Sequence, residues 1–265
     1  MSGLALARQG SRPAALAWVP AVLLVLTAIA YPLTDAGGAV RDAVSWAIVL
    51  LGSTVSVVHA TVSRGARTGA GVLLVTAATA VVFESVGLAT GFPYGEYTYS
   101  DDLGPTLLGV PFLVPLAWLM MAWPSWLLAH RLTRGGSRAA RVGVAAAVFA
   151  AWDVVLDPQM VQAGYWTWAH PQPSLPGIDT VPLTNLAGWL LAGLVLRTLL
   201  DLLVTRTASG PRTGDGAPLL VLGWMTLGGA VAHAGWLGLP GSAAWGVLLA
   251  VPVLVALAVQ ARRTS

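Results

Sequence analysis

Long apolar stretches alternate with short polar connections along the whole chain. A helix needs roughly 20 apolar residues to cross a bilayer. On that template we expect eight spans, with seven as the alternative count: 16–33, 43–60, 69–90, 107–130, 142–158, 182–203, 217–237 and 243–260. The fifth span is expected to be short at its outer end. The pattern predicts an all-α, polytopic membrane bundle.

Arginines predict the orientation of this bundle. The chain has 14 basic residues, all of them arginine. Twelve lie before the first span, in the connections after spans two, four and six, or after the last span: Arg8, Arg12, Arg64, Arg67, Arg131, Arg134, Arg138, Arg141, Arg206, Arg212, Arg262 and Arg263. Cytoplasmic loops are enriched in Arg and Lys. We therefore expect both termini in the cytoplasm and an even number of spans.

Composition agrees with a membrane protein. Hydrophobic residues make up 56% of the 265 residues and charged residues only 9%, against about a quarter in soluble domains. We expect one membrane domain over 1–265, with no separate soluble domain and with the first span retained. The high pI of about 9.8 then reflects topology, and no nucleic-acid partner is expected. The absence of cysteine excludes disulfides, thiolate metal sites and a Cys nucleophile.

Three carboxyl groups fall within the predicted spans, toward their outer ends. Glu84 lies near the end of the third span, and Asp153 and Asp157 lie four residues apart in "AAWDVVLDPQM". A carboxylate at the centre of a membrane helix costs on the order of 2.5–3.5 kcal/mol. A use or a partner is therefore expected. The structural alternatives are a turn or cap at Asp157, which precedes Pro158, and a carboxyl bonded to a neighbouring helix at Glu84.

Other polar residues in the spans are expected to be structural. Arg197 and Asp201 are four residues apart, which predicts an ion pair near the cytoplasmic end of the sixth span. The four histidines are scattered without ligand spacing, so no metal site is expected. Aspartates four apart also occur where magnesium binds a diphosphate. That function needs a second acidic cluster and cations, and only Asp101 and Asp102 offer such a cluster, so it is disfavoured.

The two long outer loops, 91–106 and 159–181, are rich in aromatic residues and contain no Arg or Lys. One explanation is an interfacial belt of aromatic side chains. The other is a pocket whose ring faces stabilise a developing cation. The residues concerned are Tyr94, Tyr97, Tyr99, Tyr165, Trp166 and Trp168, with Glu96 among them.

Three segments together resemble a known family. They are "ESVGLATGFPYGEYTYSDDLGPTLLGVPFLVPLAW" (84–118), "AAWDVVLDPQMVQAGYWTW" (150–168) and "GIDTVPLTNLAGW" (177–189). In order and spacing they are similar to the membrane carotenoid-biosynthesis proteins of the carotenoid 1,2-hydratase and bisanhydrobacterioruberin hydratase type. The resemblance implies a hydro-lyase that adds water across the terminal double bond of an acyclic carotenoid end, giving a tertiary alcohol.

The residues fit this implied chemistry. Protonating a trisubstituted alkene needs a positioned acid but no metal or other cofactor, and a carboxyl buried away from water can keep its proton at neutral pH. We expect Asp153 and Asp157 to be the acid/base pair, with Glu84 as the alternative proton donor. Asn185 is expected to orient water, or alternatively to cap a helix. The expected substrate-binding residues are Tyr94, Glu96, Tyr97, Trp152, Trp166, Trp168 and Asn185.

Two other functions stay open on the sequence. A cofactor-free carotenoid cyclase would use the same protonation, but its product would be an isomer. A carotenoid- or lipid-binding carrier would tolerate Asp→Asn changes. The expected partners are an acyclic carotenoid and the lipid bilayer, and association with other enzymes of the pathway is compatible with them. The expected location is the cell membrane, with the site on the extracytoplasmic side.

Overall fold

The computed structural model of the chain describes residues 3–35, 37–209 and 213–264, with side chains from Ala15 to Val259 and at Arg262. Arg212 lies outside the described residues, and the side chains of Arg8, Arg12 and Arg263 lie outside the described side chains. Within the described part, eight helical segments are long and apolar enough to cross a membrane. The predicted all-α bundle of eight spans is therefore confirmed.

The helices have the following bounds: α1 (Gly3–Ala30) with the 3₁₀ turn η1 (Tyr31–Leu33), α2 (Ala39–Arg64), α3 (Ala66–Thr90), α4 (Leu113–Leu132), α5 (Arg138–Gln162), α6 (Leu183–Thr207), a seventh span over Gly216–Leu237, and α9 (Pro240–Thr264). One expectation was wrong. The fifth span is not short, because α5 continues through Pro158 to Gln162. Asp157 consequently lies inside a helix and is not a turn residue.

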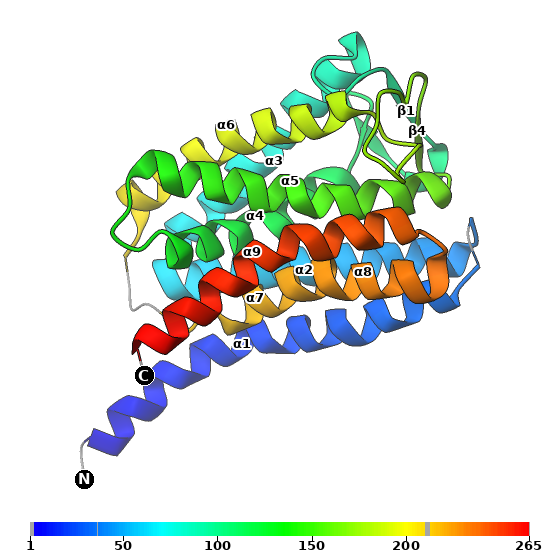
Figure 1. Cartoon of the computed structure of the whole chain (residues 1–265). Coiled ribbons are helices and arrows are strands. Elements are labelled where there is room, and N and C mark those ends of the chain that lie inside the picture. Colours follow the sequence, from blue (N-terminus) through cyan, green and yellow to red (C-terminus); the bar gives the residue numbers. More distant parts are fainter. Residues whose placement is uncertain (1–2, 36, 210–212, 265) are drawn as a thin grey trace.

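The spans lie side by side around α4, and the start of α1 and the end of α9 are at the same end of the bundle (Figure 1). The apolar window of α4 is 83% buried, and α4 packs against α2, α3, α5 and α7. A helix that is apolar on all sides is stable in such a central position. The centre of the bundle is therefore protein, and the lipid-facing surface belongs mainly to the outer helices.

The seventh span is not a regular α-helix. It consists of α7 (Gly216–Gly223), the π-helical segment η3 (Trp224–Gly228), α8 (Gly229–Ala232) and a second π-helical segment, η4 (His233–Leu237). A π-helical turn contains an additional residue and is often found at functional sites. The span therefore presents its side chains at an irregular spacing that a 3.6-residue periodicity does not predict.

The outer loops form small sheets at the end of the bundle opposite the termini (Figure 1). Strand β1 (Tyr97–Tyr99) pairs with β4 (Trp166–Trp168) in antiparallel register, with Tyr97 opposite Trp168 and Tyr99 opposite Trp166. The 3₁₀ turn η2 (Asp101–Leu103) leads to the hairpin of β2 (Thr106–Leu107) and β3 (Val110–Pro111). Tyr, Trp and Thr favour strands. The pairing of β1 with β4 joins the two aromatic loops, which are far apart in the sequence.

Glycines allow the first of these loops to enter the bundle. Helix α3 ends at Gly91, which has a left-handed backbone (φ 73°). The ring of Tyr94 then lies between Gly87 of α3 and Gly188 of α6: an added Cβ would lie 2.9 Å from the ring at Gly87 and 2.6 Å at Gly188. A side chain at either glycine would therefore push Tyr94 out of its position.

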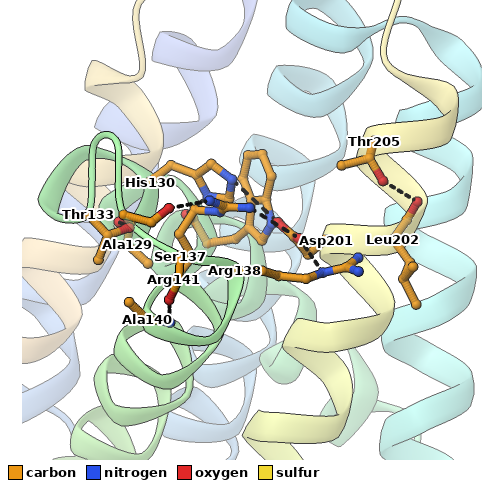
Figure 2. Close-up of polar contacts among 12 residues, drawn as sticks. Ala129, His130, Thr133, Ser137, Arg138, Ala140, Arg141, Asp201, Leu202 and Thr205 are labelled. Carbon is orange, nitrogen blue, oxygen red and sulfur yellow. Dashed lines mark hydrogen bonds and ion pairs between the residues drawn. The ribbon is translucent and has the colours of Figure 1, made fainter.

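At the end of the bundle opposite the sheets, a buried aspartate contacts three basic side chains (Figure 2). Asp201 is 2% exposed and contacts Arg138 at 2.9 Å, His130 at 3.5 Å and Arg141 at 3.7 Å. The predicted Arg197–Asp201 ion pair is therefore wrong, because Arg138 and Arg141 at the start of α5 reach Asp201 instead. The guanidinium of Arg197 donates to the carbonyl of Ala122 and lies 4.5 Å from the centre of the Phe149 ring.

Candidate active site

A cavity of about 90 Å³ lies under the two-stranded sheet, between the ends of the helices that carry the predicted acids. Its wall contains two carboxyl groups, those of Glu84 and Asp157, together with the amide of Asn185. Eight of the ten predicted site residues line it: Glu84, Tyr94, Tyr97, Trp152, Asp157, Trp166, Trp168 and Asn185. Most of the predicted site residues therefore lie in the wall of one cavity.

The two aspartates are held together by one amide. Asp153 and Asp157 follow each other by one turn of α5, and both are buried, at 1% and 3% exposure. The Nδ2 group of Asn185, on α6, donates to Asp153 Oδ2 at 2.8 Å and to Asp157 Oδ2 at 2.5 Å. Because one nitrogen bonds both oxygens, the carboxyl groups lie close together. The side chain of Asn185 serves this pair, while the N-cap position of α6 is Pro182.

The members of the pair differ in what they face. Asp157 lines the main cavity, whereas Asp153 lines a smaller one of about 20 Å³ behind it. The Oδ1 atom of Asp153 is buried without a hydrogen-bond partner among the described residues. No ion pair in the described part of the chain includes either aspartate or Glu84. The pair is thus an acidic group that no neighbouring cation neutralises.

Glu84 is held by the strand that follows it in the sequence. The hydroxyls of Tyr97 and Tyr99 donate to Glu84 Oε2 at 2.5 and 2.8 Å. Burial, and then the nearby charge of Glu84, raise the pKa of both tyrosines well above the usual value. The hydroxyls therefore keep their protons and act as donors. Two hydrogen bonds to the Glu84 carboxyl thus come from strand β1.

Aromatic rings form a large part of the remaining wall. Tyr97 contacts Trp168 with ring centres 6.0 Å apart, and Tyr99 contacts Trp166 edge to face at 5.7 Å. Below them, Trp118 and Trp189 lie 5.0 Å apart, and Trp152 meets Trp189 edge to face at 5.9 Å. The Tyr94 hydroxyl is buried without a partner among the described residues. Several ring faces and the free hydroxyl of Tyr94 are therefore directed at a small volume.

One predicted residue is elsewhere. The side chain of Glu96 is exposed and does not line the cavity, while its backbone carbonyl accepts a hydrogen bond from the Ala169 amide. Asp101 and Asp102 are likewise exposed on η2. The alternation of the strand explains the position of Glu96, because its neighbour Tyr97 faces inward.

The sequence reasoning missed Gln159, which lines the cavity. Its Oε1 atom accepts a hydrogen bond from Nε2 of His233 at 3.0 Å, and His233 Nδ1 lies 2.6 Å from the Ser242 hydroxyl. This arrangement leaves the amide N–H groups of Gln159 available to the cavity. Trp152, Leu156 and Gln159 follow the helical spacing of one face, so periodicity from Trp152 could have identified it.

Comparison with known proteins gives two matches. Residues 44–253 match the family described as carotenoid biosynthesis protein. A protein described as bisanhydrobacterioruberin hydratase, from Haloarcula japonica, is 42% identical over 121 residues. That alignment covers 44% of this chain and 40% of the relative, so less than half of either protein is compared. No solved structure matches the chain.

Proposed function

The chain belongs to the carotenoid biosynthesis protein family, and on that premise we propose that it is a carotenoid hydratase. The reaction would add water across the terminal double bond of an acyclic carotenoid end and give a tertiary alcohol. The Haloarcula japonica relative is described as a hydratase, which supports this class of reaction. Which carotenoid reacts is outside the proposal.

One observation carries the proposal: the bridged pair of aspartates in the wall of an otherwise mostly apolar, aromatic cavity. Two carboxylates this close repel each other, and no cation pairs with them in the described residues. Such pairs hold one proton between them. Asp157 faces the cavity and is therefore the proposed donor, while Asp153 shares the remaining charge.

The reaction balances without any other reactant. The proton of Asp157 adds to the CH carbon of the terminal R–CH=C(CH₃)₂ group, and the electron pair of the double bond forms the new C–H bond. The carbon with two methyl groups becomes a tertiary cation. The oxygen of water bonds to that carbon, and one proton of the water returns to a carboxylate of the site. Once that proton has passed to Asp157, the carboxyl groups are in the state in which they began.

Glu84 and the rings would stabilise the cation. The hydroxyls of Tyr97 and Tyr99 both donate to the Glu84 carboxyl, and bonds of this kind favour its ionised form. The electron-rich faces of Trp118, Trp152 and Trp189 also attract a positive centre. We therefore assign Glu84 to cation stabilisation and proton acceptance from water, in preference to its predicted role as the alternative donor.

Water must be positioned on the same carbon. The wall offers the amide of Gln159 and the hydroxyl of Tyr94 for this task, since Asn185 is bonded to the two aspartates. We propose that Gln159, oriented by His233, holds the attacking water. The cavity lies at the end of the bundle remote from the arginine-rich connections, which supports a site on the extracytoplasmic side.

Product mass tests the proposal. Cells that accumulate lycopene would express the wild type or Asp157→Asn, with protein levels matched by immunoblot. We expect a product heavier by one water from the wild type and about 10²- to 10⁴-fold less from the variant. An isomer of unchanged mass would instead indicate the cyclase. Unchanged lycopene from the wild type, together with carotenoid that copurifies with both proteins, would indicate a carrier.

A further inference from the structure

A second cavity adjoins the acidic one and is larger, at about 340 Å³. Both cavities share Tyr31, Ile48, Trp152, Leu156, Gln159 and Met225 as lining residues. The second cavity lies among η1, α5 and the irregular seventh span. Its outer rim contains Leu33, Val231 and Trp236, which are 61–69% exposed on a surface that faces lipid in a membrane bundle.

A third cavity, of about 460 Å³, continues toward the other end of the bundle between α5, the seventh span and α9. Val155 lines both the second and the third cavity. Glycines flank this residue: an added Cβ would lie 3.0 Å from Val155 at Gly229 and 2.9 Å from it at Gly246. The side chain of Val155 therefore packs directly against these two glycines, and a larger residue at either position would displace it.

Helix α5 provides one continuous wall for these cavities. The lining residues from Val144 to Gln159 follow a spacing of three or four, as expected for one face of a helix. At 1.5 Å per residue this stripe is about 22 Å long, a large part of the roughly 30 Å thickness of a bilayer core. Apart from Gln159, every α5 side chain on it is apolar.

We propose that the second and third cavities form the binding site for the polyene chain of the substrate, with the reacting terminus in the acidic cavity. The inference rests on the proposed function for the identity of the ligand. A polyene is long, rigid and apolar, and it matches a long apolar groove that ends at the carboxyl pair. The side chains of Trp152, Trp224 and Trp236 give the groove flat surfaces against which a conjugated chain packs.

The geometry also explains why a terminal double bond would react. The groove leads to the acids from the side, and the acidic cavity of about 90 Å³ is small compared with the groove. Only the end of a long chain could then reach Asp157. The internal double bonds would stay in the groove, whose lining contains no carboxyl group among the described residues.

The test is lycopene binding by the full chain in detergent micelles, followed by visible circular dichroism. An achiral polyene gains such a signal only when it is held in a chiral site. Ala232→Phe fills the second cavity and Ala151→Phe fills the third, whereas Ala78→Phe adds the same ring to an exposed position of α3 outside both cavities. Thermal unfolding and size exclusion would check that each variant is folded.

We expect each cavity-filling variant to weaken lycopene binding at least tenfold, while Ala78→Phe binds like the wild type. Wild-type binding by a folded Ala232→Phe and a folded Ala151→Phe would overturn the proposal and leave the cavities to lipid acyl chains. If one variant does not fold, the other decides. Binding that depends on the groove, without any hydration, would disprove only the proposed hydratase activity. Hydration that is unchanged in the cavity-filling variants would disprove only the proposed groove.

Discussion

At the residue scale, the role of each carboxyl group depends on which atoms bond it and which cavity it faces. The sequence predicted that Asp153, Asp157 and Asn185 share a site, because two residues four apart lie on one helix face. It could not predict that Asp157 faces the main cavity and Asp153 the smaller one. A difference of about 40° around a helix axis separates the two side chains, and only the packing of α6 against α5 decides which one meets the open space.

The contacts of Glu84 lead to a prediction about β1. Tyr97→Phe and Tyr99→Phe each remove one hydroxyl donor and keep the ring. Because a hydrogen bond to a charged group contributes about 1.5–3 kcal/mol, we expect each variant to lower the hydration rate about 10- to 100-fold. Thr98→Val, on the same strand with an exposed side chain, is the matched control. Wild-type rates in both tyrosine variants would show that Glu84 has no part in the reaction.

Gln159 should act after the proton has been transferred. Gln159→Met keeps the side-chain length but removes the amide, so the cation should form and then lose a proton again before water captures it. In D₂O we expect the alcohol to fall at least tenfold while deuterium still enters the recovered carotenoid. His233→Ala should show the same pattern more weakly, because it acts through Gln159. Equal loss of alcohol and deuterium would place Gln159 in the protonation step.

At the element scale, the helices were predictable from the sequence, and the strand pairing of the two long loops was not. Apolar stretches fixed the eight spans within a few residues, except for α4 and α5. Helix α4 begins later than expected because the β2–β3 hairpin occupies residues 106–111. The pairing of β1 with β4 joins segments about seventy residues apart in the sequence, and no local pattern encodes such a long-range register.

The insertion of Tyr94 between two helices gives a prediction about stability. Gly188→Ala places a methyl group 2.6 Å from the Tyr94 ring, so we expect unfolding in detergent to require about 1–3 kcal/mol less free energy. Gly143→Ala, in α5, has no atom within 4 Å of the new methyl group and should stabilise the protein by up to about 1 kcal/mol. The two changes thus have opposite expected signs. Equal stabilities would contradict the close packing at Tyr94.

At the scale of the whole molecule, the polar groups divide between the two ends of the bundle. The acids and aromatic rings of the cavity lie at one end, and Asp201 lies at the other, where His130, Arg138 and Arg141 converge on it (Figure 2). Arg41 belongs to the cavity end, where it donates to the carbonyls of Tyr31 and Thr34 and closes the connection between α1 and α2. Arg41 is not one of the twelve arginines that predict the orientation, and these bonds give it a structural role instead.

Topology can be measured directly because the chain contains no cysteine. Thr98→Cys and Ala139→Cys introduce single thiols at exposed positions near opposite ends of the bundle. With a membrane-impermeant maleimide on intact cells, we expect Thr98→Cys to be labelled and Ala139→Cys to be labelled only after lysis. The reverse pattern would place the acidic cavity on the cytoplasmic side and both termini outside.

The central claim is that Asp157 transfers a proton to the terminal alkene carbon. The most direct measurement is carbon-bound deuterium in the carotenoid after reaction of the purified full chain in D₂O, for the wild type, Asp157→Asn and Asp153→Asn. We predict at least one carbon-bound deuterium in the wild-type alcohol, almost none in either product or recovered substrate with Asp157→Asn, and an intermediate loss with Asp153→Asn. Deuterium incorporation by folded Asp157→Asn at the wild-type rate would contradict the account.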